Sequence, residues 1–191
     1  MKNKILITGT GRTGTSILVK LFTYLGMDTG FTNEEINIEL NKDLNKKANA
    51  GLEKGDLNQD IRIHKAPCFA ERIDEILSNH AVEHVIIPIR NLKHTAKSRE
   101  NLSPDCGGFF GDCKTYKEQM IYNAMLLHNL IESLERNQIN YTMLHFPKFL
   151  YEYKILYTKL EWLFAEYDVT PHKYATTMDA IVDFKKIHFK V

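Results

Sequence analysis

The sequence predicts an α/β fold of three layers, in which a parallel β-sheet of four to five strands is flanked by helices. Two observations predict it. Short apolar segments with the composition of buried strands alternate with longer segments of helical periodicity. A glycine-rich turn, GTGRTGTS, joins the first of these strands to the first helix. Strands that alternate with helices favour parallel pairing, with helices on both faces of the sheet.

The first half of the chain supplies two of the predicted strands. Residues 4–10 (KILITGT) form the first, because apolar side chains run without interruption to a glycine turn, and residues 61–64 (IRIH) form the second. Three helices are predicted in this half. The first covers residues 14–26 and ends at Gly26, the second is indicated by a thin apolar stripe within residues 32–50, and the third covers residues 67–80 and begins with Pro67. Residues 49–60 lie between the last two as a loop.

The second half repeats the alternation. The predicted strands are residues 83–90 (EHVIIPIR) and 141–146 (YTMLHF). The predicted helices are residues 92–101, 116–135 and 148–166, and residues 103–113 (SPDCGGFFGDC) form a glycine-rich loop. Ligands of such sheets collect at the carboxyl ends of the strands, which directs attention to the loop after Gly9, to His64 and Lys65, to Arg90 and to His145.

Composition limits the classes of function. The 191 residues fit one domain, residues 1–191, that is large enough to bury a core. A net charge of +1 predicts neither a nucleic-acid surface nor a membrane-binding one, so any cationic site is local. No apolar run reaches the roughly 18 residues of a membrane span, and the N-terminus lacks a signal-peptide core. Three cysteines do not indicate a disulfide framework, and we expect a cytoplasmic protein.

The turn GTGRTGTS predicts an anion-binding site. Gly9 and Gly14 stand at the spacing of the G-x-x-x-x-G-K-[ST] phosphate loop, which makes the expected fold P-loop NTPase-like. A glycine-rich turn that opens a helix presents backbone N–H groups and the positive helix end to an anion. Thr15 stands where the motif has lysine, and Arg12 supplies a cation inside the loop instead.

The strand ends argue against a magnesium-dependent nucleotide triphosphatase. Such an enzyme holds its metal with a carboxylate at the end of a neighbouring strand. None of the predicted strands ends in Asp or Glu, so the site is predicted to be built from cations, with no metal site. Two alternatives stay open: an ATP-dependent P-loop kinase or hydrolase that uses Lys20 or Lys65 on the phosphates, and a non-catalytic module that binds an anionic partner.

The cationic elements resemble those of the sulfotransferase family, which uses 3′-phosphoadenosine-5′-phosphosulfate (PAPS) as donor. Arg12 and Gly14 match the family's 5′-phosphosulfate loop, which has small hydroxyl residues after its last glycine. IRNLKHTAKS (89–98) matches the family's strand-end arginine followed eight residues later by a serine, and INYTMLHFPKFL (139–150) resembles the turn after its last core strand. The donor-binding residues that the resemblance implies are Gly11, Arg12, Thr13, Gly14, Thr15, Ser16, Arg90 and Ser98.

The resemblance also implies a mechanism without a metal. A sulfuryl group passes in line to a hydroxyl or amine, and 3′,5′-bisphosphoadenosine (PAP) remains. A non-catalytic module with this fold that only binds bisphosphoadenosine stays open as an alternative. The candidate catalytic residues are Arg12, Lys65 and His64, of which Lys65 in HKAP matches a Lys-x-Pro found after the second core strand of many relatives. The general base stays open between His64, whose unperturbed pKa is suitable, and Glu34 or Glu35, since some relatives use a glutamate from that region.

The acceptor is predicted only as a class. The short polar segments 27–60 and 102–114 favour a small-molecule or carbohydrate acceptor over a flat apolar one. We expect residues 103–113 to form a flap over that acceptor, with Phe109 and Phe110 as contacts. The C-terminal tail offers Lys185 and Lys186 to the 3′-phosphate, and the protein is expected to be a monomer or a homodimer.

Overall fold

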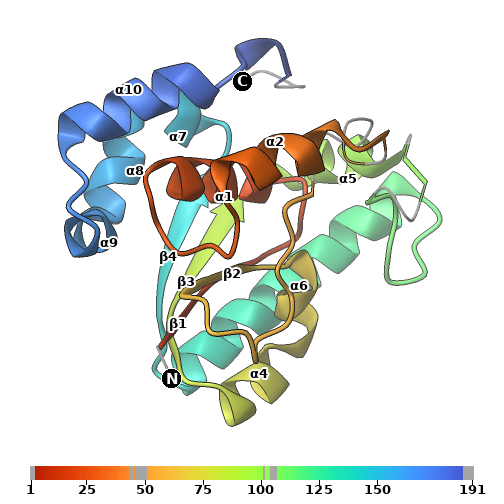
Figure 1. Cartoon of the computed structure of the whole chain (residues 1–191). Coiled ribbons are helices and arrows are strands. Elements are labelled where there is room, and N and C mark those ends of the chain that lie inside the picture. Colours follow the sequence, from red (N-terminus) through yellow and green to blue (C-terminus); the bar gives the residue numbers. More distant parts are fainter. Residues whose placement is uncertain (1–2, 44, 46–50, 101, 104–106, 187–191) are drawn as a thin grey trace.

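The protein is built around a four-stranded, all-parallel sheet with the strand order β2-β1-β3-β4 (Figure 1). The computed structural model describes residues 3–43, 45, 51–100, 102–103 and 107–186. The strands are β1 (Lys4–Ile7), β2 (Ile63–Lys65), β3 (Val82–Ile89) and β4 (Asn140–His145). The predicted three-layer α/β arrangement with a parallel, P-loop-like sheet is therefore confirmed.

Helices cover both faces of this sheet. They are α1 (Thr15–Tyr24), α2 (Asn33–Asn41), α4 (Ile73–Asn79), α5 (Leu92–Glu100), α6 (Tyr116–Arg136), α7 (Lys148–Tyr151), α8 (Tyr153–Lys159), α9 (Glu161–Glu166) and α10 (Pro171–Ile181), with 3₁₀ turns η1 (Pro67–Arg72) and η3 (Phe184–Lys186). None of the helices in the described ranges is long and apolar enough to cross a membrane.

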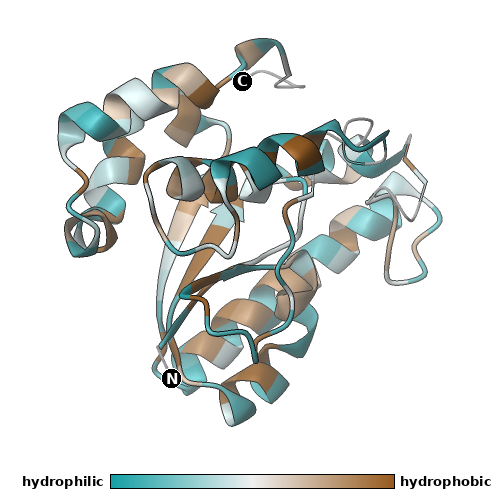
Figure 2. Ribbon diagram, in the orientation of Figure 1, coloured by the Kyte–Doolittle hydropathy of each residue, from teal (hydrophilic) through white to brown (hydrophobic). Residues whose placement is uncertain are grey.

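Two hydrophobic clusters form the core, one on each face of the sheet. Alternate residues of a strand point to opposite faces, so Ile5 and Ile7 pack with α1, α8, α9 and α10, whereas Leu6 packs with η1, α4 and α6. Apolar stretches lie in the sheet and in the helices on either side of it (Figure 2). Burial on both faces explains why the strands are continuous apolar runs rather than alternating ones.

The parallel register brings four strand ends to one edge of the sheet. Ile7 lies opposite Lys65 of β2 and Ile86 of β3, and Ile89 lies opposite His145 of β4. The loop after β1 therefore lies between Lys65 on one side and the end of β3 on the other. This order decides which residues can reach one ligand.

Two of the segments predicted as single helices are divided in the structure. Residues 67–80 divide into η1 and α4, because Arg72 leaves helical geometry (φ −123°, ψ 25°). Residues 148–166 divide into α7, α8 and α9 at Glu152 (ψ 77°) and at Leu160, which is fully buried. Packing of the large side chains against the sheet overrides helix propensity here. The α10 helix, not predicted above, has a Thr170 cap followed by a proline at its first position.

Candidate functional site

The loop between β1 and α1 has the geometry of an anion cradle. Gly9, Gly11, Arg12 and Gly14 all have positive φ angles (141°, 66°, 57° and 86°). Gly14 is the N-cap of α1, no side chain caps this helix start, and its first turn has no acidic residue. The backbone N–H groups at the positive end of the helix are therefore available to an anion.

Two of these glycines are required by close neighbours as well as by their φ angles. A Cβ atom on Gly11 would lie 2.5 Å from an Nη atom of Arg99, and one on Gly14 would lie 2.5 Å from Cδ2 of Phe146. Both contacts are too short for any real Cβ. The loop is thus packed directly against α5 on one side and the end of β4 on the other.

A cavity of about 630 Å³ opens over this loop. It is large enough for a nucleotide-sized ligand. Five cationic and three carboxylate side chains line it: Arg12, Lys20, Lys65, Arg90 and Arg99, with Glu53, Glu71 and Asp183. Its apolar lining comes from α1, α2, α7, the end of α10 and the residue after it, the start of η1, the 107–113 loop and the residue after β4: Ile17, Leu40, Pro67, Phe110, Phe146, Leu150, Ala180, Ile181 and Val182.

Arg12, Arg90 and Ser98, predicted from separate segments, lie together at this cavity. Arg12 Nε donates a hydrogen bond to Ser98 Oγ over 3.2 Å, and an Nη atom of Arg90 donates to the carbonyl of Arg12 over 3.3 Å. The Arg90 guanidinium also stacks on Phe146, 5.2 Å from the ring centroid. Burial lowers the pKa of Arg12 and, with the charge of Arg12, that of Arg90. A ligand that carries negative charge relieves this mutual repulsion.

Lys65 lies on the opposite side of the loop, at the end of β2. It is 3% exposed, and its Nζ donates to the carbonyl of Gly51 over 2.8 Å and to Glu53 Oε1 over 3.2 Å. Burial lowers the pKa of Lys65, and Glu53 opposes that effect. Ser16 Oγ donates to the same Gly51 carbonyl over 2.8 Å, which ties the start of α1 to this segment.

The remaining loop residues have different surroundings. Gly11, Gly14 and Thr15 line the cavity together with Ser16. Thr13 is fully buried away from the cavity lining, and its hydroxyl has no partner among the described residues. Its contribution to a ligand is therefore limited to the backbone.

His64 is not brought to the cavity. It is fully buried, and its Nε2 lies 3.1 Å from the carbonyl of Ile61 and 3.3 Å from Lys4 Nζ, whereas Lys65 lines the cavity. Neighbours on a strand point to opposite faces, so Lys65 and His64 cannot both face the ligand. Burial, and then the charge of Lys4, lower the pKa of His64. This placement does not support the predicted role of His64 as general base.

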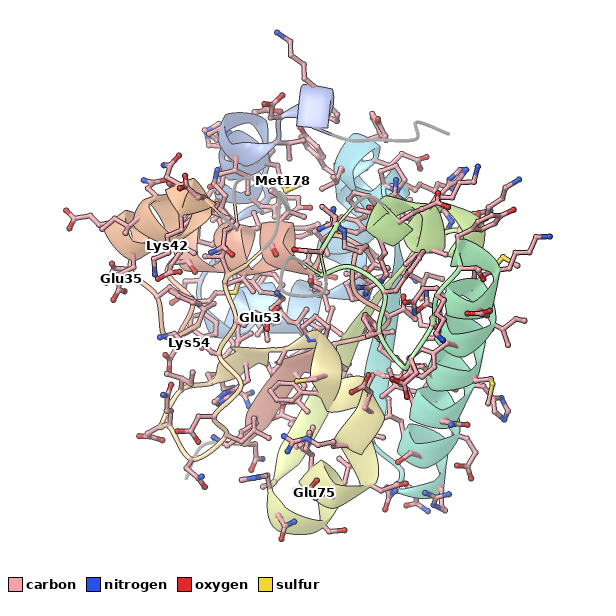
Figure 3. The ribbon with its side chains drawn as sticks, turned by 90° about the vertical axis from the view of Figure 1, so that its right-hand side faces the viewer. Glu35, Lys42, Glu53, Lys54, Glu75 and Met178 are labelled. Carbon is pink, nitrogen blue, oxygen red and sulfur yellow. The ribbon has the colours of Figure 1, made fainter. Side chains whose placement is uncertain are left out.

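The glutamates of α2 do not reach the cavity either. Glu35 forms a capping box in which its carboxylate accepts from the Thr32 N–H over 2.7 Å, and these hydrogen bonds lower its pKa. Glu34 is exposed in the same first turn and does not line the cavity. Figure 3 shows Glu35 at the outer edge of α2, while Glu53 lies inward beneath α1. The tail lysines Lys185 and Lys186 also lie outside the cavity lining.

Arg99 is the main site residue that the sequence reasoning missed. It is 2% exposed, and its two Nη atoms donate to the carbonyls of Thr10, Gly107 and Gly108 over 2.6, 2.8 and 2.9 Å. Burial, and then the charge of Arg12, lower its pKa to about 9, and the charge of Glu71 opposes this effect. A signal existed, because Thr95, Ala96 and Arg99 are the buried stripe of α5 at helical spacing.

Glu53 and Glu71 were also missed. Both glutamates lie in segments without a recognisable motif. Of the two phenylalanines predicted to contact an acceptor, Phe110 lines the cavity and Phe109 does not. Phe110 also stacks on Arg99, with Cζ 3.8 Å from the ring centroid. Residues 104–106 of the predicted flap lie outside the described residues.

The comparisons add no family to this geometry. A scan against protein-family models, a search of the curated proteins and a search of the solved structures each returned no match. Within the described part of the chain, no group of three or more His, Cys, Asp or Glu side chains could hold a metal ion.

Proposed function

We propose that this protein is a PAPS-dependent sulfotransferase whose donor site is the cavity over the β1–α1 loop. The observation that carries the proposal is the meeting of Arg12, Arg90 and Ser98 beside an uncapped helix start. Two phosphate-type groups on one nucleotide need two separate cationic contacts. The loop with Arg12, whose Nε is hydrogen-bonded to Ser98, offers one, and the fork of Arg90 offers the other.

The donor supplies an activated sulfuryl group, and this chain supplies position and charge. Backbone N–H groups of Gly11 to Ser16 and the Arg12 guanidinium hold the 5′-phosphosulfate. Arg90 binds the 3′-phosphate, and Phe146 orients its guanidinium by stacking. Arg99 adds a third buried cation, which only Glu71 partly offsets among the described residues, and the charge of the ligand compensates it further.

The acceptor's proton is received by Glu53 in this proposal. The acceptor oxygen forms a bond to sulfur while the bond from sulfur to the bridging phosphate oxygen breaks, and that oxygen keeps the electron pair. Glu53 takes the proton from the acceptor hydroxyl and releases it to solvent. Lys65, held 3.2 Å from Glu53 and buried beside the loop, stabilises the negative charge that develops on the bridging oxygen.

Calorimetry with PAP and with ATP, each with and without magnesium, tests the proposal. We expect PAP to bind wild-type protein without a metal, and Arg12→Gln to weaken that binding by roughly 10-fold or more, as for a charge-assisted contact. Lys42→Gln is the matched control, because it removes the same charge from an exposed side chain outside the cavity (Figure 3). Preference for magnesium-ATP would contradict the proposal and favour a kinase.

A further inference from the structure

The sheet order decides where an acceptor binds, given the proposed function. Arg90 and Phe146 follow β3 and β4, on one side of the loop, and Lys65 ends β2, on the other. A donor held with its 3′-phosphate on Arg90 places its nucleoside over β3 and β4. In-line transfer requires the acceptor on the opposite side of the sulfuryl group. The acceptor therefore lies against the residues at the end of β2.

The wall at the end of β2 is polar. It consists of Lys65, Pro67, Cys68 and Glu71, with Glu53 from the segment before β2. Most of the large apolar residues of the cavity belong to α1, α2, α7 and α10 and to the end of β4 instead, and Phe110 of the 107–113 loop, which lies near this wall, has its ring stacked on Arg99. A phenol or a steroid would leave these polar groups buried without partners, which is unfavourable.

Glu71 is held in place by α6 and by the 107–113 loop. The Tyr122 hydroxyl donates to Glu71 Oε1 over 2.9 Å. The Tyr122 ring packs edge-on against Phe110, with centroids 5.6 Å apart. Gly111 makes room for it, because a Cβ there would lie 2.3 Å from the ring. The carboxylate is thus oriented by a packed aromatic pair.

Glu71 is the second carboxylate of this wall, and it lies close enough to Arg99 for the two charges to interact. The third carboxylate of the cavity, Asp183, follows α10 instead. Lys65 pairs with Glu53, and the arginines of the loop and of α5 face the donor's anionic groups. Glu71 forms no salt bridge in the described residues, and the Tyr122 hydroxyl that it binds is neutral. A carboxylate at the mouth of a site accepts hydrogen bonds from hydroxyls and attracts an ammonium group, and it repels a second carboxylate.

We propose, on the basis of the proposed function, that the acceptor is an amine-bearing sugar. Its hydroxyl is sulfated beside Glu53, and its ammonium group is bound by Glu71. Tyr122 is a positioning residue, since it acts through Glu71. Cys68 lies between the two glutamates in sequence and lines the same wall.

Sulfuryl transfer from PAPS to four matched probes tests this inference: glucosamine, glucose, glucuronic acid and 4-nitrophenol. We expect wild-type kcat/KM to fall in that order, with glucosamine favoured over glucose by roughly fivefold, the size of a partly exposed ion pair. Glu71→Gln is expected to remove the preference for glucosamine over glucose, because it lowers kcat/KM for glucosamine more than kcat/KM for glucose. Tyr122→Phe is expected to reduce the preference in part.

Glu75→Gln is the control, because Glu75 is an exposed carboxylate of α4 far from the cavity (Figure 3). Transfer to 4-nitrophenol or glucuronic acid at a rate equal to that of glucosamine overturns the inference, as does an unchanged preference in Glu71→Gln. PAP binding without transfer to any of the four probes also overturns it. Failure to bind PAP at all overturns the proposed function instead.

Discussion

Replacement of Gly14 by alanine is expected to separate two effects on the anion cradle, backbone strain and steric exclusion. Gly14 has φ 86°, and Gly26 at the end of α1 has φ 88°. A Cβ on Gly26 meets nothing within 4 Å, whereas one on Gly14 lies 2.5 Å from Phe146 Cδ2 and 2.9 Å from Cε2. The two substitutions therefore share the strain and differ in the clash.

The magnitudes follow from this comparison. An L-residue in the left-handed region loses about 1–2 kcal/mol, which is the whole expected effect of Gly26→Ala. Overpacking against the Phe146 ring adds about 1–3 kcal/mol to Gly14→Ala. Displacement of that ring also breaks its stacking with Arg90, so Gly14→Ala is expected to lose PAP affinity, and Gly26→Ala is not.

Urea unfolding and calorimetry with PAP measure both effects. The effects of Gly14→Ala and Phe146→Ala on the free energy of unfolding are expected to be non-additive, because removal of the ring also removes the clash. In the Phe146→Ala background, Gly14→Ala should therefore destabilise the protein only as much as Gly26→Ala does. Equal destabilisation by Gly14→Ala and Gly26→Ala, together with wild-type PAP affinity in Gly14→Ala, would refute the reasoning.

Three further outcomes are expected. His64→Gln is expected to leave PAP affinity within about twofold of wild type. The wild-type protein is expected to lose folding stability as pH falls below 6.5, because the pKa of buried His64 is lowered and the unfolded state therefore binds a proton first. The variant is expected to lack this loss. The wild-type protein is expected to lose folding stability between pH 10 and about 12, because burial and Glu71 raise the pKa of Tyr122 from 10.0 to about 12 and the unfolded state therefore ionises first. Tyr122→Phe is expected to lack this loss. Glu53→Gln keeps PAP affinity and lowers transfer by roughly 10²-fold or more, as loss of a general base does, measured by the release of PAP.

The sheet could be predicted because its strands are local patterns. ILI (5–7) and VIIPI (85–89) are continuous apolar runs, followed by the glycine-rich turn and by Arg90, and parallel pairing follows from the helices between them. The division of residues 148–166 into three helices could not be predicted in the same way. It depends on how Phe149, Leu160 and Phe164 fit the sheet and α10, and such packing has no local signature.

The site was predictable where it is made of strand ends and glycines. Arg12, Lys65 and Arg90 lie at the cavity because parallel strands end at a common edge. Arg99 and Glu71 could not be assigned in the same way, since their positions depend on contacts with the 107–113 loop and α6. His64 shows the opposite case, in which a chemically suitable residue points to the wrong face of its strand.

The most direct test of the donor site is the coupling between Arg90 and the 3′-phosphate. PAP and adenosine 5′-monophosphate differ only in that phosphate, so their affinities for wild type and Arg90→Ala form a double-mutant cycle. The account predicts a loss of roughly 10- to 100-fold for PAP, as for a bidentate charge-assisted contact, and little change for adenosine 5′-monophosphate. Equal losses for both ligands would mean that Arg90 does not hold the 3′-phosphate, and this would contradict the account.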